Sequence, residues 1–119
     1  MPEFLFRFKM SEDVVTEEDE EAVRLQAQRM ADAVQAKIEE IFYPWTVGFE
    51  IREFGITNNM PDFYVLAQVT DRNDTLASTV ATAETSIIEI MQKMTKRDQR
   101  VGCWFQRVKG VWNEVYGLL

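Results

Sequence analysis

The segment Glu3-Phe4-Leu5-Phe6-Arg7-Phe8-Lys9-Met10 decides the fold of this chain. Large apolar side chains stand at every second position from Phe4 to Met10, and most of the residues between them are charged. Successive side chains of a strand point to opposite faces of a sheet, so this period of two predicts a β-strand with one apolar face. An apolar face must be covered, and the segments that follow are suited to cover it.

Two long amphipathic helices are the predicted cover. From Thr16, the expected N-cap, to about Phe42, apolar residues recur at spacings of three and four and form one helical stripe. The members of this stripe are Val23, Ala27, Met30, Val34, Ile38 and Ile41. Pro44 cannot continue a helix, so the helix should end just before it. A second stripe consists of Leu76, Val80, Ala83, Ile87, Ile90 or Met91, and Met94.

Three further strands complete the predicted sheet. Their alternating segments are residues 47–51, 63–69 and 101–105. Phe54 and Ile56 fall out of phase with the first of these, which predicts a bulge at Arg52–Glu53. The order β-α-β-β-α-β predicts an α+β, ferredoxin-like sandwich in a single domain, residues 1–119. An extra C-terminal strand or short helix is expected after the Lys109-Gly110 turn.

Composition excludes several classes of function. The chain has 119 residues, no histidine and one cysteine, which leaves no Ser-His-Asp triad, Cys-His dyad or HExxH zinc site. No glycine-rich phosphate loop occurs, so we assign no catalytic residue, no metal ligand and no cofactor from side-chain motifs. Glu3, Arg7 and Lys9 interrupt any signal-peptide apolar region, and no apolar run approaches membrane-spanning length. A cytoplasmic protein without a membrane partner is expected.

The charge is concentrated at the start of the first helix. Seven acidic residues and no basic residue lie between Glu12 and Glu21, and removing them leaves 13 acids against 13 bases. Acids in a first helical turn favour the helix dipole, which is the structural explanation. The functional explanation is a docking patch for a basic protein partner. Its candidate binding residues are Glu17, Glu18, Glu20 and Glu21.

The sheet face opposite the helices is the second candidate surface. Strand parity assigns to it an aromatic and basic group of residues. The candidate partner-binding residues of this group are Arg7, Arg52, Tyr64, Leu66 and Trp104. A solvated face seldom holds so many apolar side chains. Three occupants are considered: a C-terminal segment carrying Trp112 and Tyr116, a second copy in a homodimer, or a dedicated partner.

These two surfaces favour a non-enzymatic binding or regulatory protein. We expect an acidic inhibitor or adaptor, of the kind that phages and mobile elements encode, that binds a partner protein. Aromatic residues beside Arg7, Lys9 and Arg52 also resemble the stacking platform of RNA-recognition domains. However, the basic-glycine-aromatic signature is missing and the net charge of -7 opposes phosphate, so nucleic acid is not the expected partner.

An enzymatic alternative begins at Met1-Pro2. This start, followed by strand, helix and strand and then a second such unit, resembles the tautomerase superfamily. In that family the initiator methionine is removed and the exposed proline nitrogen is the general base. The resemblance implies that Pro2 would be the base here, whereas the structural explanation is that Pro2 only begins a strand. The two candidate surfaces favour the non-enzymatic hypothesis over this one.

Overall fold

The computed structural model describes residues 2–10, 16–54, 59–70 and 75–108. Within these ranges the chain forms a small α+β fold with the predicted element order. Its elements are β1 (Glu3–Lys9), α1 (Glu17–Phe42), β2 (Gly48–Phe54), β3 (Phe63–Thr70), α2 (Thr75–Met94) and β4 (Val101–Val108). The four strands make one mixed sheet in the order β2-β1-β3-β4. β1 pairs in parallel with β2 and antiparallel with β3, and β3 pairs in parallel with β4.

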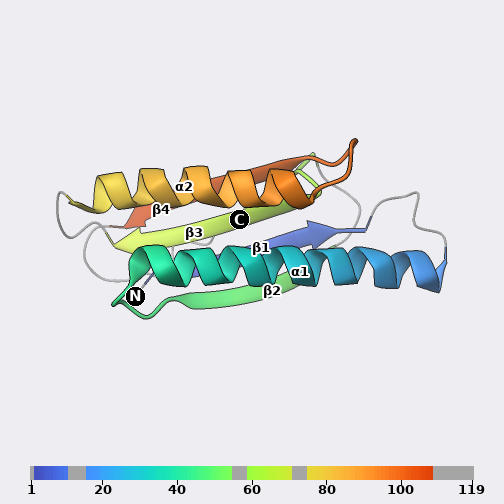
Figure 1. The fold of residues 1–119 in the computed structure, drawn as a ribbon, viewed down its shortest axis with the longest axis horizontal. Coiled ribbons are helices and arrows are strands. Elements are labelled where there is room, and N and C mark those ends of the chain that lie inside the picture. The colour runs from blue at the N-terminus through green and yellow to red at the C-terminus, as the bar shows by residue number, and fades with distance from the viewer. Residues whose placement is uncertain (1, 11–15, 55–58, 71–74, 109–119) are drawn as a thin grey trace.

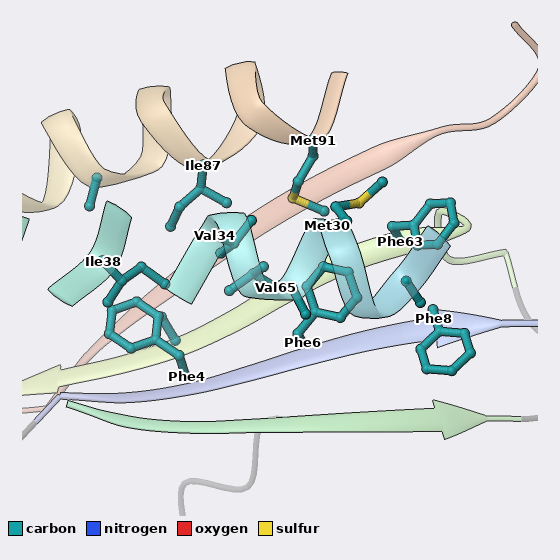
Figure 2. Packing of buried hydrophobic residues seen from close by; sticks show 14 of the residues in the cluster. Phe4, Phe6, Phe8, Met30, Val34, Ile38, Phe63, Val65, Ile87 and Met91 are labelled. Atoms are coloured by element: carbon teal, nitrogen blue, oxygen red, sulfur yellow. The ribbon is translucent and has the colours of Figure 1, made fainter. Parts of the chain in front are cut away.

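Both helices lie on one face of the sheet, as predicted (Figure 1). Phe4, Phe6 and Phe8 of β1 are buried and point towards the helices, where Met30, Val34 and Ile38 of α1 and Ile87 and Met91 of α2 meet them (Figure 2). Burying a phenylalanine contributes about 1.5–3 kcal/mol, so the alternation in β1 stabilises the contact between the layers. The residues predicted for the covered face of β2, β3 and β4 belong to this core or pack against it.

The boundaries of α1 follow the local signals in the sequence. Thr16 is the N-cap, and its Oγ1 accepts a hydrogen bond from the backbone N–H of Asp19 at 3.1 Å. The helix ends at Phe42, two residues before Pro44, and the backbone N–H of Trp45 donates to the carbonyl of Phe42 at 2.8 Å. This turn directs the chain into β2 at the edge of the sheet.

The predicted bulge in β2 is wrong. The pairing of β1 with β2 runs one to one from Glu3 opposite Gly48 to Lys9 opposite Phe54. Regular pairing throughout means that Phe54 lies on the open face of the sheet, where the ring of Tyr64 contacts it. The change of phase in the sequence therefore marks the point where the apolar side chains of β2 pass from the helix-facing side to the open side. On the open side Phe54 joins a second group of aromatic residues through its contact with Tyr64. Ile56 lies outside the described residues.

Two further expectations concern other parts of the chain. The predicted extra element after Lys109-Gly110, including Trp112 and Tyr116, falls outside the described residues. Neither helix in the described ranges is both long enough and apolar enough to cross a membrane. The cytoplasmic location stays a prediction.

Replacing Phe6 tests the packing of the two layers. Phe6 is fully buried beneath α1 and α2, so Phe6→Ala removes buried apolar surface and leaves a cavity. We expect a loss of about 3–5 kcal/mol in the free energy of unfolding, measured by urea denaturation. The control is Tyr43→Ala at an exposed aromatic residue, which should change that free energy by less than about 0.5 kcal/mol. Equal effects would contradict the described core.

Candidate functional site

Pro2 lies at the end of the sheet where β1 and β2 begin and β3 and β4 end (Figure 1). The carbonyl of Pro2 accepts a hydrogen bond from the backbone N–H of Gly48 at 2.8 Å. Pro2 is partly buried. Its backbone is thus fixed to β2 by the first bond of the parallel pairing, while a proline at this position removes no hydrogen bond from the sheet.

A polar group lies beside Pro2 on the open face of the sheet. Glu3 stands opposite both Gly48 and Gln68 in the strand register. The Glu3 carboxylate occupies the space above Gly48, so that a Cβ atom at this position would collide with it. The Nε2 atom of Gln68 donates to Oε1 of Gln106 at 3.2 Å. We call Pro2, Glu3, Gly48, Gln68 and Gln106 the Pro2 end.

The helix-facing side of the Pro2 end is apolar. The ring of Phe4 meets Phe42 edge-on at 5.6 Å and Phe105 edge-on at 5.8 Å between centroids. Phe42 is the last residue of α1, and the five residues after it lead to Gly48, which bonds Pro2. Tyr43 and Trp45 in this connection are 81% and 54% exposed. The Pro2 end is therefore a small polar group with core aromatic rings on its helix side and exposed aromatic side chains in the neighbouring connection.

This combination suits proton transfer by an amine. An α-amino group ordinarily has a pKa of about 7.7–8.0, so a large fraction is neutral and basic near neutral pH. An apolar surrounding disfavours the charged form of an amine and increases that fraction. Pro2 provides such an amine only when its nitrogen is a chain terminus, because an amide nitrogen in a peptide bond is not basic.

Sequence reasoning named Pro2 but missed the residues around it. Glu3 directly follows Pro2, and that adjacency was the available signal. Gly48, Gln68 and Gln106 reach the Pro2 end only through strand pairing, which joins residues 38 or more apart in sequence. No local pattern could have selected them.

The predicted open-face residues form a cluster at the other end of β1. The Arg7 guanidinium lies 4.6 Å from the ring centroid of Phe54 and 5.6 Å from that of Tyr64. Tyr64 also meets Trp104 edge-on at 5.9 Å. Tyr64 is only 1% exposed despite lying on this face, whereas Trp104 is 46% exposed. Burial raises the pKa of Tyr64 above its ordinary value, and the charge of Arg7 opposes that rise.

The remaining predicted residues of the open face are less closely tied to this cluster. Leu66 is partly buried and lies between Leu5 and Trp104 in the strand register. Arg52 stands opposite Arg7, but its Nε donates to Glu50 Oε1 at 2.9 Å. The structure thus brings Arg7, Tyr64 and Trp104 together. Their action on a partner, homodimer formation included, stays a prediction.

The acidic residues lie far from Pro2. α1 begins at the opposite end of the molecule from Pro2, and Glu17, Glu18 and Glu21 in its first turns are exposed (Figure 1). Glu20 contacts Arg24 at 3.5 Å, and Arg24 reaches Glu53 of β2 at 2.9 Å. The hydrogen bond to Glu53 raises the pKa of Arg24. A basic partner for these acids remains a prediction.

Metal binding gains no support from side-chain geometry in the described ranges. No three histidine, cysteine, aspartate or glutamate side chains there are grouped as a metal site requires. Cys103 is partly buried on the helix-facing side of β4. Burial raises the pKa of its thiol from 9.0 to about 12, and the Glu84 charge adds to the rise. Cys103 is consequently a poor nucleophile.

Comparison with known proteins shows a shared fold at low sequence identity. No protein-family model matches the chain, and no curated protein matches it. A structure of Pt0534 inactivated by 2-oxo-3-pentynoate has a TM-score of 0.60 at 8% identity, covering 90% of this chain and 85% of that one. MIF2 of Leishmania major has a TM-score of 0.55 at 15% identity, covering 95% and 94%. Malonate semialdehyde decarboxylase has a TM-score of 0.52 at 11% identity, covering 96% and 91%.

These similarities contradict the hypothesis of a non-enzymatic inhibitor or adaptor. One of the similar proteins is a decarboxylase by name, and another is inactivated by a reactive oxo acid. What these proteins share with this chain, at 8% to 15% identity, is the fold. The composition misled because the absence of histidine excludes only catalysis that needs histidine, while an amino-terminal nitrogen belongs to the backbone.

The reactivity of Cys103 tests its assigned environment. With a pKa of about 12, the thiolate fraction at about pH 8 is roughly a thousandfold lower than for a thiol of pKa 9.0. We expect the native protein to react with a thiol-specific disulfide reagent about a thousandfold more slowly than the denatured protein. The chain has one cysteine, so the signal is unambiguous. Similar native and denatured rates would show that Cys103 is a reactive thiol after all.

Proposed function

We propose that this protein is a tautomerase-like enzyme in which the nitrogen of Pro2, freed by removal of Met1, is the general base. One observation carries the proposal: Pro2 begins a central strand in a fold shared with such proteins, and Gly48 fixes its backbone. For malonate semialdehyde decarboxylase, a variant with the proline at position one exchanged for alanine was solved beside the wild type. The substitution of that proline in a protein of similar fold is a reason to test Pro2 as the base in this chain.

The proposed reaction moves one proton. The neutral secondary amine takes a proton from the carbon next to a carbonyl group, which yields an enolate and a protonated amine. The amine then returns the proton to the enolate oxygen or to another carbon of the conjugated system. No redox partner or metal is needed, since the electron pair of the broken C–H bond stays in the enolate and the amine holds the proton, which it can exchange with solvent before returning it.

The surroundings of Pro2 assign subsidiary roles. The rings of Phe4, Phe42 and Phe105 form part of the core that backs this end of the sheet on the helix side. The amide group of Gln106 lies on the open-face side and offers N–H donors to a developing enolate oxygen. We propose a small enolisable carbonyl compound as substrate, because malonate semialdehyde, in the name of one similar protein, is of this type, and 2-oxo-3-pentynoate, which inactivated another, is also a small oxo acid.

Exchange of a carbon-bound proton tests the base directly. 2-Oxobutanoate in deuterated water serves as a probe, and the loss of its C3 proton signal is followed by NMR. The wild type should accelerate this exchange, and a chain with one extra residue before Pro2 should lose about 10²-fold or more of the acceleration, because its proline nitrogen is an amide. The rate should rise with pH up to about 8, where an α-amino group becomes neutral.

Covalent labelling is the second arm of this test. The neutral amine is expected to add to C4 of 2-oxo-3-pentynoate, the alkyne carbon β to the ketone, with the amine proton moving to C3. The product is a one-to-one adduct at Pro2, identified by peptide mass spectrometry. Intact mass must first show that Met1 is absent. Retention of Met1, or labelling at lysine with Pro2 unmodified, would refute the proposed base.

A further inference from the structure

A groove lies on the helical layer at the end of the molecule opposite Pro2. It has a volume of about 410 Å³, near the lower limit of small-molecule sites. α1 contributes the residues from its first half, and the end of α2 contributes the other wall. The lining residues are Ala22, Leu25, Gln26, Arg29, Met94 and Lys96. About four helical turns separate this groove from Phe42, where α1 reaches the Pro2 end.

Side-chain amides hold the two walls of the groove together. Gln26 Nε2 on α1 donates to the carbonyl of Met94 at 3.1 Å and to Gln99 Oε1 at 2.7 Å. Gln99 returns a hydrogen bond to Gln26 Oε1 at 3.2 Å and accepts one from the backbone N–H of Lys96 at 2.7 Å. The polar atoms of Gln26 are therefore used within the protein. The methylene groups of Gln26 are the part of its side chain that remains for contact within the groove.

The floor of the groove is apolar and accessible. Leu25 is 51% exposed. Because burial of a leucine side chain is favourable, a ligand that covers it would gain binding free energy. Ala22 lies one helical turn before Leu25 and Gln26, and Met94 packs against the core beneath. An alkyl chain lying along Leu25 and Met94 would remove apolar surface of both partners from water.

Positive charge marks the rim. Arg29 and Lys96 line the groove, and no ion pair joins either side chain to another described residue. Arg24, Lys37 and Arg52 do pair with carboxylates. Arg29 and Lys96 are thus two cations that pair with no carboxylate of the described ranges and lie beside an apolar floor, on a chain of net charge -7. The complementary ligand is an anion with an apolar tail.

We propose that this groove binds a small amphipathic carboxylate, with its alkyl chain along Leu25 and Met94 and its carboxylate near Arg29 and Lys96. The volume suits one chain of moderate length rather than a folded partner. The site is distinct from the Pro2 end and does not depend on the proposed enzymatic function.

Titration with octanoate tests the proposal. Backbone amide NMR shifts of the full-length protein should change saturably in α1 around Leu25 and Arg29 and at the end of α2. Hexanoate should bind about fourfold more weakly, since two methylene groups that are half-removed from water are lost. The uncharged octanol should also bind more weakly than octanoate, and a cationic octyl-ammonium compound should not bind in the groove.

Matched variants separate the two contributions. Arg29→Gln with Lys96→Gln should weaken octanoate binding by about tenfold and leave octanol binding unchanged, while Leu25→Ser should weaken both. These residues are at least partly exposed, and far-UV circular dichroism checks that the variants fold. A chain with an extra residue before Pro2 should bind octanoate normally, which keeps this test independent of the catalytic one.

Three outcomes would overturn the proposal. Shift changes confined to the Pro2 end would place the carboxylate there instead. Equal octanoate affinity in the charge-removing double variant would remove the role of Arg29 and Lys96. Binding of a Glu- and Leu-rich peptide without any binding of octanoate would show that the occupant is a polypeptide.

Discussion

The structure depends on the central position of β1. This strand is bonded on both sides, to β2 and to β3, and it directs Phe4, Phe6 and Phe8 into the layer below the two helices. Only one side of β1 is apolar, because the residues that alternate with its phenylalanines include Glu3, Arg7 and Lys9. The helices pack on that apolar side. The same constraint brings Pro2 to the middle of one end of the sheet, where Gly48 holds it. A proline tolerates this position because the ladder needs no N–H from it.

The two faces of the sheet differ in the kinds of side chains that they carry. The helix-facing side is a continuous apolar core, while the open side carries a mixture of charged, amide, leucine and aromatic side chains. On the open side Arg7 is stabilised by the rings of Phe54 and Tyr64, and its Nε has no hydrogen-bond partner among the described residues. Cation–π contact replaces a carboxylate partner there. Tyr64 is buried on the face that neither α1 nor α2 covers.

Local sequence signals predicted the elements well, and non-local pairing explains what they missed. Thr16 as N-cap, Pro44 as the end of α1 and the alternation in β1 are each visible within a few residues. Phe54 was misinterpreted as evidence of a bulge, since its phase has meaning only when Tyr64 of β3 is placed beside it. The Pro2 end was incomplete for the same reason, because Gln68 and Gln106 meet it through strands from distant segments. The register that joins them is set by the whole sheet.

Composition constrains function less than it constrains fold. Counting side chains excludes catalysis that requires histidine, a metal held by cysteines or a glycine-rich phosphate loop. A count of side chains does not include the terminal amine, which every chain has once. Whether that amine can take part in catalysis depends on its position in the fold. In this protein Pro2, which directly precedes β1, is bonded through its carbonyl to Gly48, and the amides of Gln68 and Gln106 lie at the same end of the sheet. Under the proposed function, the position of the first strand, rather than the residue inventory, decides whether a proline nitrogen freed of Met1 can act as the base.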